Sequence, residues 1–306
     1  MFPGQGSQHP CMLRELPDHP AVRETLAEAN GVLGREVLEF STSEALTSTV
    51  TVQLALLVSG TATARALAAE EGRPDFVAGH SVGAFAAAVV AGTLTFSDAL
   101  RLVDLRAHAM RAAYPEGYAM GVVVGLGERT VSQLVAKVDR PEAPIHTANV
   151  NAPLQVSVSG ADDALEQLFD LARRKGARHA GYLTVSIPSH TPLLAPVAAE
   201  LSQALANVSL HPPTIPYISN VGGRALRDPD AVREDLARSV ECPVRWHDAT
   251  TLLYELGVRL FVEVPPGNVL TRLAADAFPD ARCVSIDESD LESALLLIRR
   301  TQNRTW

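Results

Sequence analysis

The feature that most constrains the fold is the stretch from Asp75 to Gly92, DFVAGHSVGAFAAAVVAG. Apolar residues typical of the end of a buried strand lead into Gly-x-Ser-x-Gly around Ser81, and an Ala-rich apolar segment typical of a helix follows. This layout is that of a nucleophile elbow. Small glycines let strand and helix approach each other, and the free N–H groups and dipole of the helix favour developing negative charge beside the serine. The alternative is an ordinary turn in which Ser81 only caps the helix.

Composition describes an ordinary globular protein. The chain has 306 residues, of which 47% are hydrophobic and 20% charged, enough for one large domain or one domain with an insertion. The formal net charge of −9 gives no support to nucleic-acid binding. The three cysteines are odd in number and far apart, which predicts reduced thiols rather than a disulfide framework or a metal site: Cys11, Cys242 and Cys283.

No targeting or membrane segment is expected. No apolar run approaches the roughly 18 residues of a membrane span, and the first residues lack the basic and apolar regions of a signal peptide. We therefore expect a cytoplasmic protein that does not contact a membrane.

The order of periodic segments predicts an α/β fold. Helical patterns over 16–38 and 49–70 precede the elbow, another helix begins near Thr95, and helices and buried strands alternate again from residue 193 onward. Residues 118–187 instead read β-α-β-β-α-β, the ferredoxin-like arrangement. We expect a large α/β-hydrolase-like domain with a parallel-sheet core over 1–117 and 188–306, into which 118–187 is inserted as a small ferredoxin-like subdomain.

Two further residues lie in segments suited to a site. Gln5 is flanked by glycines in a loop where backbone can come close to a ligand, although a plain surface turn is the alternative. The strand that would feed this loop is missing or shortened. His190 lies between Pro188 and Pro192, which restrict the backbone and hold the imidazole in a loop of low entropy. On local evidence alone, a histidine satisfied by backbone groups is an equal alternative for His190.

Seven stretches together resemble one family. They run in family order over nearly the whole chain: FPGQGSQ, GHSVG, LRAHAM, ANVNAPLQVSVSG, VSIPSHTPLL, CPVRW and VEVPPGNVLTRL. In these the chain resembles the malonyl-CoA:acyl-carrier-protein transacylases, the acyltransferase family shared by fatty-acid and polyketide synthesis. The resemblance implies malonyl-CoA and an acyl-carrier protein as partners and no cofactor beyond the prosthetic group that the carrier bears.

The resemblance also implies roles for the catalytic residues. Ser81 is expected to take the acyl group, and His190 to act as its general base and then as the acid for the departing thiol. In the family a backbone carbonyl orients the histidine, and the matching position falls near Ser239. Gln5 and the backbone N–H of Val82 are expected to form the oxyanion hole, where one lost donor costs about 3–4 kcal/mol.

Substrate contacts follow in the same way. Arg106 is expected to hold the free carboxylate of the malonyl group, because a planar guanidinium suits a carboxylate in an apolar pocket. His80 is expected as a wall of the acyl pocket and Asn151 near the mouth of the site. The remaining expected substrate contacts come from the stretches that resemble the family: Ser189 and Met110.

Softer features resemble a specialised branch of the family. The segment after the elbow, Ala84 to Ala86, is wholly apolar where family members commonly carry Glu or Gln, and the segments LPDHPAV and NVGGRAL accompany it. These resemble the acyltransferase subunit of bacterial malonate decarboxylase, which implies transfer of malonyl to the carrier subunit of that complex and contact with its other subunits. A transacylase of fatty-acid or polyketide synthesis is the alternative.

Two other classes of function stay open. A serine hydrolase of the α/β-hydrolase type needs an acid between the serine and the histidine in chain order, and the candidates, Asp139 and Asp162, both fall in the insert. A non-catalytic docking subunit would need none of the candidate catalytic residues. The cluster Arg173-Arg174-Lys175 with Arg178 could steer an acidic carrier, but cations at a helix C-terminus are the simpler interpretation.

Overall fold

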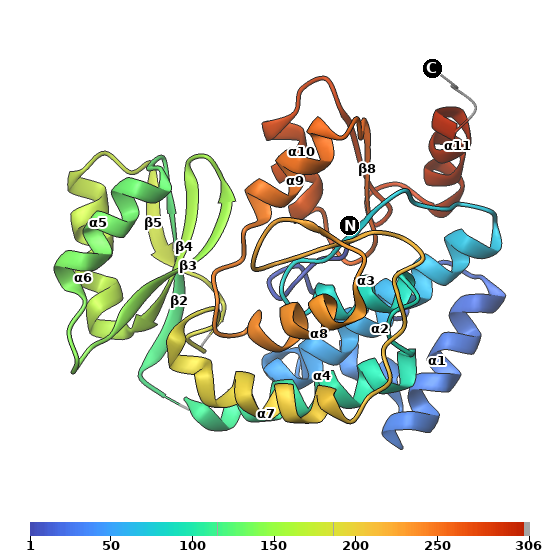
Figure 1. The fold of residues 1–306 in the computed structure, drawn as a ribbon, viewed down its shortest axis with the longest axis horizontal. Coiled ribbons are helices and arrows are strands. Elements are labelled where there is room, and N and C mark those ends of the chain that lie inside the picture. Colours follow the sequence, from blue (N-terminus) through green and yellow to red (C-terminus); the bar gives the residue numbers. More distant parts are fainter. Residues whose placement is uncertain (115, 186, 303–306) are drawn as a thin grey trace.

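The computed structural model describes residues 1–114, 116–185 and 187–302 as a mixed α/β fold (Figure 1). The helices before the small part are α1 (Pro20–Leu33), α2 (Thr49–Ala69), α3 (Gly83–Val90) and α4 (Phe96–Ala113), with the 3-10 turns η1 (Val37–Ser41) and η2 (Ala45–Thr47) between α1 and α2. Later helices are α5 (Glu128–Val138), α6 (Asp162–Arg174), α7 (Ala195–Ala206), α8 (Pro229–Arg238), α9 (Trp246–Glu255), α10 (Val269–Ala277) and α11 (Leu291–Gln302), and η3 (Pro192–Leu194) precedes α7.

The strands of the large part are short and form two separate sheets. β1 (Val77–Ala78) pairs in parallel with β6 (Tyr217–Ile218), which pairs antiparallel with β7 (Ala225–Leu226). A second parallel pair is β8 (Leu260–Glu263) with β9 (Arg282–Ser285). Parallel pairing in the large part is therefore limited to these two short pairs, and β7 runs antiparallel; a single hydrolase-like parallel sheet stays a prediction.

The first two residues join these two groups of strands. Phe2 donates its N–H to the carbonyl of Ala78 at 2.9 Å, and the amine of Met1 donates to the carbonyl of Val262 at 2.6 Å. Phe2 also forms an isolated parallel bridge with Gly79. This bridge leads directly into the loop around Gln5.

Helix α2 forms the centre of the hydrophobic core. Side chains on all its faces are buried, as is typical of a helix whose apolar residues are not confined to one face. It is also long and apolar enough to cross a membrane by length and composition, with a mean hydropathy of 1.3, so the expectation that no stretch approached that length was wrong. In the structure 83% of that window is buried inside the protein, which is the packing of a core helix.

Residues 118–182 form a separate four-stranded antiparallel sheet beside the large part (Figure 1). Its strands are β2 (Tyr118–Val124), β3 (Ile145–Ala152), β4 (Gln155–Ala161) and β5 (His179–Tyr182), in the spatial order β3-β4-β2-β5. Helices α5 and α6 pack on it around their own hydrophobic cluster. The element order is the predicted β-α-β-β-α-β, while the last strand ends earlier than the predicted 187, and Ser186 lies outside the described residues. The domain boundaries themselves remain a prediction.

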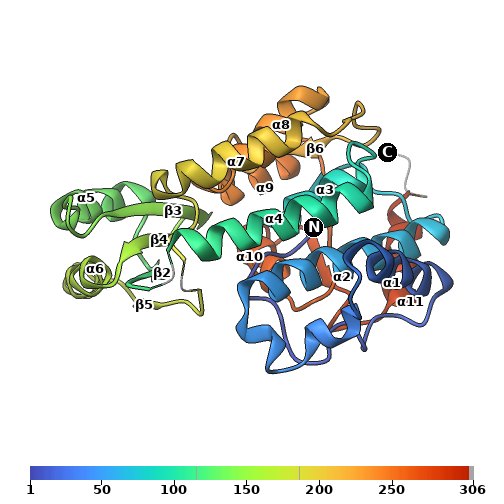
Figure 2. The ribbon, with the colours of Figure 1, turned by 90° about the horizontal axis from the view of Figure 1, so that it is seen from below.

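The first helix is shorter than the sequence pattern predicted. The first helix begins at Pro20 rather than near Leu16, because the ring of His19, and not Asp18, accepts a hydrogen bond from the N–H of Ala21. It ends at Leu33, and Gly34 follows with a φ of +61°, which suits glycine at a helix C-terminus. Figure 2 shows how the long helix α4 lies between α7 and α2, which brings its central residues next to the elbow.

Candidate active site

The predicted elbow is present as a strained turn between β1 and α3. Ser81 adopts a φ of +55°, in the left-handed region that a non-glycine residue seldom occupies. A Cβ on Gly79 would lie 2.1 Å from the backbone of Gly83, so only glycine fits where strand and helix cross. Val82, rather than Ser81, is the N-cap of α3, and no side chain caps that helix. The alternative in which Ser81 merely caps the helix is therefore wrong.

The hydroxyl of Ser81 faces His190. Their Oγ and Nε2 atoms lie 2.8 Å apart, although the two residues are 109 positions apart in the chain. The other ring nitrogen, Nδ1, lies 2.5 Å from the backbone carbonyl of Ser239. Because a carbonyl can only accept, Nδ1 carries the proton and Nε2 is free to accept one from the serine.

His190 is rigidly held and kept neutral. It is 2% exposed, its backbone has a φ of +63°, and its N–H donates to the carbonyl of Val240 at 2.8 Å. Burial, together with the positive charge of Arg106 and the nearby His80, lowers the pKa of His190 to about 3. The imidazole is therefore unprotonated at neutral pH and available as a base.

Arg106 projects from α4 into the same space. Its Nη2 lies 3.2 Å from the Oγ of Ser81, and its Nη1 donates to the side-chain oxygen of Gln53 on α2. The residue is 1% exposed and its Nε is buried without a hydrogen-bond partner. Across the described ranges no carboxylate forms an ion pair with it, and burial lowers its pKa to about 10. A buried guanidinium without a counter-charge is costly, which suits a site that receives an anion.

His80 and Asn151 form another wall of the site. The Nε2 of His80 lies 3.1 Å from the side-chain oxygen of Asn151, and its ring meets that of Trp246 edge-on at 5.5 Å. Burial lowers the pKa of His80. Asn151 belongs to β3 in the small part of the structure, so this contact brings both parts of the chain to the elbow.

The two groups expected to form the oxyanion hole, the N–H of Val82 and the side chain of Gln5, form no hydrogen bond with the Ser81 hydroxyl in the described residues. As the N-cap of α3, Val82 carries one of the N–H groups that a helix start leaves without a helical partner. The side-chain oxygen of Gln5 accepts a hydrogen bond from the hydroxyl of Thr49 at 3.0 Å, and Thr49 also contacts Gln53. In the described part of the chain no hydrogen bond joins Gln5 to Ser81.

Of the two remaining predicted substrate contacts, Met110 lies beside the site, whereas the Ser189 side chain is used in a local turn. Met110 is 2% exposed and its sulfur accepts from the side chain of Gln53 at 3.7 Å, which places it beside the Arg106–Gln53 pair. The hydroxyl of Ser189, by contrast, lies 3.4 Å from the carbonyl of Ile187, so it satisfies the local turn.

Sequence reasoning missed three polar residues around the elbow. Gln53 orients Arg106, and Asn220 accepts the N–H of Ser81 at 2.9 Å while donating to the carbonyl of Gly79 at 2.8 Å. Asp235 on α8 in turn accepts the N–H of Asn220 at 3.1 Å. A signal existed for Gln53, which is the one amide in the mostly apolar helix α2. None existed for Asp235, because it directly follows the charged residues Arg233 and Glu234, and an acid in such a segment is usually exposed.

Features outside this cluster do not contribute to it. Asp139 accepts the N–H of Ile145 and Asp162 begins α6, so neither acid orients His190 as a hydrolase triad would require. Arg173 is engaged by Asp170 and by the carbonyl of Ala180, as cations at a helix end would be. The three cysteines are free, and the described ranges hold no group of three or more residues that could bind a metal ion.

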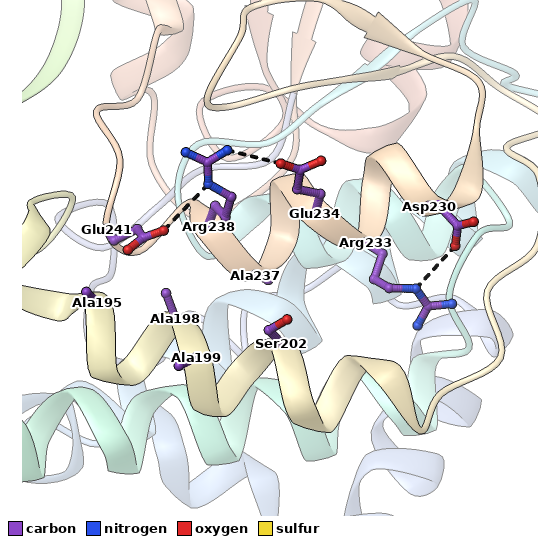
Figure 3. Close-up of a pocket in the computed structure, with 10 residues that line it drawn as sticks. All are labelled: Ala195, Ala198, Ala199, Ser202, Asp230, Arg233, Glu234, Ala237, Arg238 and Glu241. Carbon is purple, nitrogen blue, oxygen red and sulfur yellow. Dashed lines mark hydrogen bonds and ion pairs between the residues drawn. The ribbon is translucent and has the colours of Figure 1, made fainter.

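A cavity of about 380 Å³ lies elsewhere, between α7 and α8 (Figure 3). It is lined on the α7 side by small residues and on the α8 side by charged residues that pair with one another, such as Arg238 with Glu234 and Arg233 with Asp230. Ser81 is not among its lining residues. The candidate site is therefore the cluster of Ser81, His190 and Arg106, in which a hydroxyl, a neutral base and an anion-binding group face one another.

Comparisons with known proteins concern the chain as a whole. Residues 1–303 match the family model described as the acyl transferase domain. Malonyl CoA-acyl carrier protein transacylase of Haemophilus influenzae is 35% identical over 295 residues, covering 94% of each chain, and that of Escherichia coli K12 is 34% identical over 97% of each. The crystal structure of FabD from Acinetobacter baumannii has a TM-score of 0.93 at 35% identity, over 98% of this chain and 97% of that one. A malonyl-transacylase in complex with a type II PKS acyl-carrier protein has a TM-score of 0.92 at 35% identity, over 97% and 98%.

Proposed function

The chain belongs to the acyl transferase family, and from that premise we propose that it is an S-malonyltransferase, which moves malonyl from malonyl-CoA to the thiol of an acyl-carrier protein. The observation that carries the proposal is the meeting of Ser81, His190 and Arg106, with Oγ 2.8 Å from the imidazole and 3.2 Å from the guanidinium. The relatives described above act on the same kind of substrate, and the complex among them contains a carrier protein.

The chemistry uses two half-reactions. In the first, Nε2 of His190 takes the proton of Ser81 as Oγ attacks the thioester carbon, and the imidazolium returns that proton to the sulfur of CoA as the C–S bond breaks. In the second, His190 takes the proton of the carrier thiol, which attacks the Ser81 ester, and gives it back to Oγ. The Ser239 carbonyl keeps the ring in the tautomer that both steps need.

Arg106 supplies substrate selectivity in this proposal. Its guanidinium lies close enough to Ser81 for one substrate to reach both, and its buried charge lacks a counter-ion in the described part of the chain. A malonyl carboxylate would provide that counter-ion through charge-assisted hydrogen bonds. We assign the oxyanion hole to the N–H of Val82 with Gln5, and the acyl-pocket wall to His80 and Asn151.

The narrower expectation of a malonate decarboxylase subunit rests on sequence segments alone. None of the relatives described above is such a subunit, and their names support a carrier-protein transacylase. We therefore favour the transacylase, while the malonate decarboxylase system, contact with its other subunits and a cytoplasmic location stay predictions.

Labelled malonyl-CoA tests the proposal. The wild-type protein is expected to form a malonyl ester on Ser81, which mass spectrometry of peptides locates, and Ser81→Ala is expected to abolish it. Adding a carrier should discharge the ester to the carrier thiol; an acyl-carrier protein and the carrier subunit of malonate decarboxylase, supplied in parallel, distinguish the two systems. Discharge mainly to water with both carriers present would favour the hydrolase instead.

A further inference from the structure

Asp235 is a buried carboxylate without a cationic partner. It lies on α8, is 5% exposed, and forms no ion pair with any residue in the described ranges. Instead it accepts four hydrogen bonds, two at each oxygen. The donors are the hydroxyls of Tyr217 at 2.7 Å and Ser219 at 2.5 Å, and the N–H groups of Asn220 at 3.1 Å and Val221 at 3.0 Å. Four donors satisfy the charge, which a buried carboxylate requires.

The residue that Asp235 holds is the one that clamps the elbow. Asn220 is 3% exposed, and its side-chain amide bonds both sides of the strained turn, accepting from the N–H of Ser81 and donating to the carbonyl of Gly79. A left-handed conformation at a serine persists only where its surroundings enforce it. The path from the carboxylate to the nucleophile therefore has two steps, Asp235 to Asn220 and Asn220 to Ser81.

The same helix also holds the base. Helix α8 ends at Arg238, and the next residue, Ser239, accepts the Nδ1 proton of His190. Val240 then accepts the backbone N–H of His190. One rigid helix thus fixes the nucleophile through Asp235 and the base through its C-terminal carbonyls, and so sets the distance between them.

Resting on the proposed function, we propose that Asp235 is a positioning residue for catalysis: by fixing Asn220 it keeps the hydroxyl of Ser81 aligned with His190. It touches no reacting atom itself. Loss of the carboxylate is expected to let the elbow relax, which slows attack by Ser81 and leaves substrate binding through Arg106 in place. A displacement of about 1 Å at a reacting group can cost about 100-fold in rate.

The test has two measurements. The first is the rate of Ser81 acylation in a single turnover at varied malonyl-CoA concentrations. The second is the rate of inactivation by phenylmethanesulfonyl fluoride, a reaction that needs only the serine and the histidine. Asp235→Asn is expected to slow both reactions by about 10- to 100-fold, with the half-saturating malonyl-CoA concentration unchanged. Asp230→Asn, which changes an exposed acid of the same helix, is the matched control. It is expected to react at the wild-type rate.

A double-mutant cycle guards against a folding defect. Asn220→Ala is expected to slow acylation as Asp235→Asn does, and the double variant no further, because the two residues act in one chain. Asp235→Asn protein that is folded and reacts at the wild-type rate, additive losses in the cycle, or an equal loss in Asp230→Asn would each overturn the assignment. Failure of the wild-type protein to load malonyl would count against the proposed function only, since the sulfonyl fluoride still reports on Asp235.

Discussion

Arg106 is the residue whose environment departs furthest from what its type leads one to expect. An arginine on a helix is usually solvated, yet this one is 1% exposed, hydrogen-bonded to Gln53 and Ser81, and without a carboxylate partner in the residues that the structure describes. Desolvation lowers its pKa to about 10, so it stays charged at neutral pH. The residue is therefore arranged to bind an anion next to the nucleophile.

Replacing Arg106 by alanine is expected to change which acyl group is loaded. For malonyl loading, kcat/KM should fall by an amount that corresponds to about 2–5 kcal/mol of lost transition-state stabilisation. The reason is that the substrate carboxylate would be buried without a partner. Acetyl loading should stay unchanged or rise, since it lacks that carboxylate. Parallel assays with malonyl-CoA and acetyl-CoA measure the ratio, and Arg101→Ala, an exposed arginine on the same helix, is the control. Equal losses for both substrates would argue against carboxylate recognition.

At the scale of the element, the elbow depends on a crossing of β1 and α3 that leaves no room for a side chain. Gly79 approaches the backbone of Gly83, and a Cβ on Gly83 would lie 2.3 Å from the carbonyl oxygen of Phe2. Backbone atoms on both sides cannot yield as a flexible side chain would. The packing of three segments therefore fixes the turn that presents Ser81.

Gly79→Ala is expected to lower the free energy of unfolding by about 1–3 kcal/mol or more, because the added methyl overlaps backbone. Gly31→Ala, in the exposed face of α1 where a Cβ would meet nothing within 4 Å, should instead stabilise the protein by about 0.5–1 kcal/mol. Urea unfolding monitored by circular dichroism compares the two variants. Equal effects of both substitutions would show that the elbow is not close-packed.

At the scale of the whole molecule, the site is assembled from both parts of the chain. Asn151 of β3 contacts His80, the N–H of Val150 donates to the carbonyl of Val244 at 2.9 Å, and Glu128 of α5 pairs with Arg245. These contacts seat the small sheet against the large part beside the elbow. Burial of two histidines in the assembled site then makes the stability of the whole protein depend on pH.

We expect the free energy of unfolding to fall as the pH drops below about 6.5. Between that value and about 3, the unfolded chain protonates His190 while the native protein, in which Arg106 and His80 face the ring, does not. The unfolded state therefore binds more protons, and stability is lost by up to about 1.4 kcal/mol per pH unit for this group. His80, whose pKa is also lowered, acts in the same direction.

Urea unfolding of the wild-type protein and His190→Asn between pH 5 and 8 measures this dependence. For the variant, the free energy of unfolding should depend less steeply on pH. It retains His80 but lacks His190, so only one buried imidazole stays unprotonated in the native state. A slope equal to that of the wild-type protein would show that His190 protonates as readily in the native state as in the unfolded chain.

The sequence by itself determined the local features. The Gly-x-Ser-x-Gly pattern between an apolar run and an Ala-rich run specified the elbow, because glycine is required wherever backbones nearly touch, and the periods of the apolar residues specified most helices and the β-α-β-β-α-β order. Seven motifs in order indicated the family, which is confirmed. The sequence did not determine the length of short strands such as β6, since an apolar run marks burial rather than pairing.

Only the tertiary structure decided which groups meet. Ser81 and His190 are 109 positions apart, and their 2.8 Å contact depends on the left-handed backbone of both residues and on carbonyls that follow α8. The roles of Gln53, Asn220 and Asp235 were hidden for the same reason: a polar side chain reveals in sequence only its chemistry, whereas its partner is set by how distant segments pack. The burial that leaves Arg106 without a counter-charge, and so ready for an anion, is likewise a property of the folded core rather than of helix α4 alone.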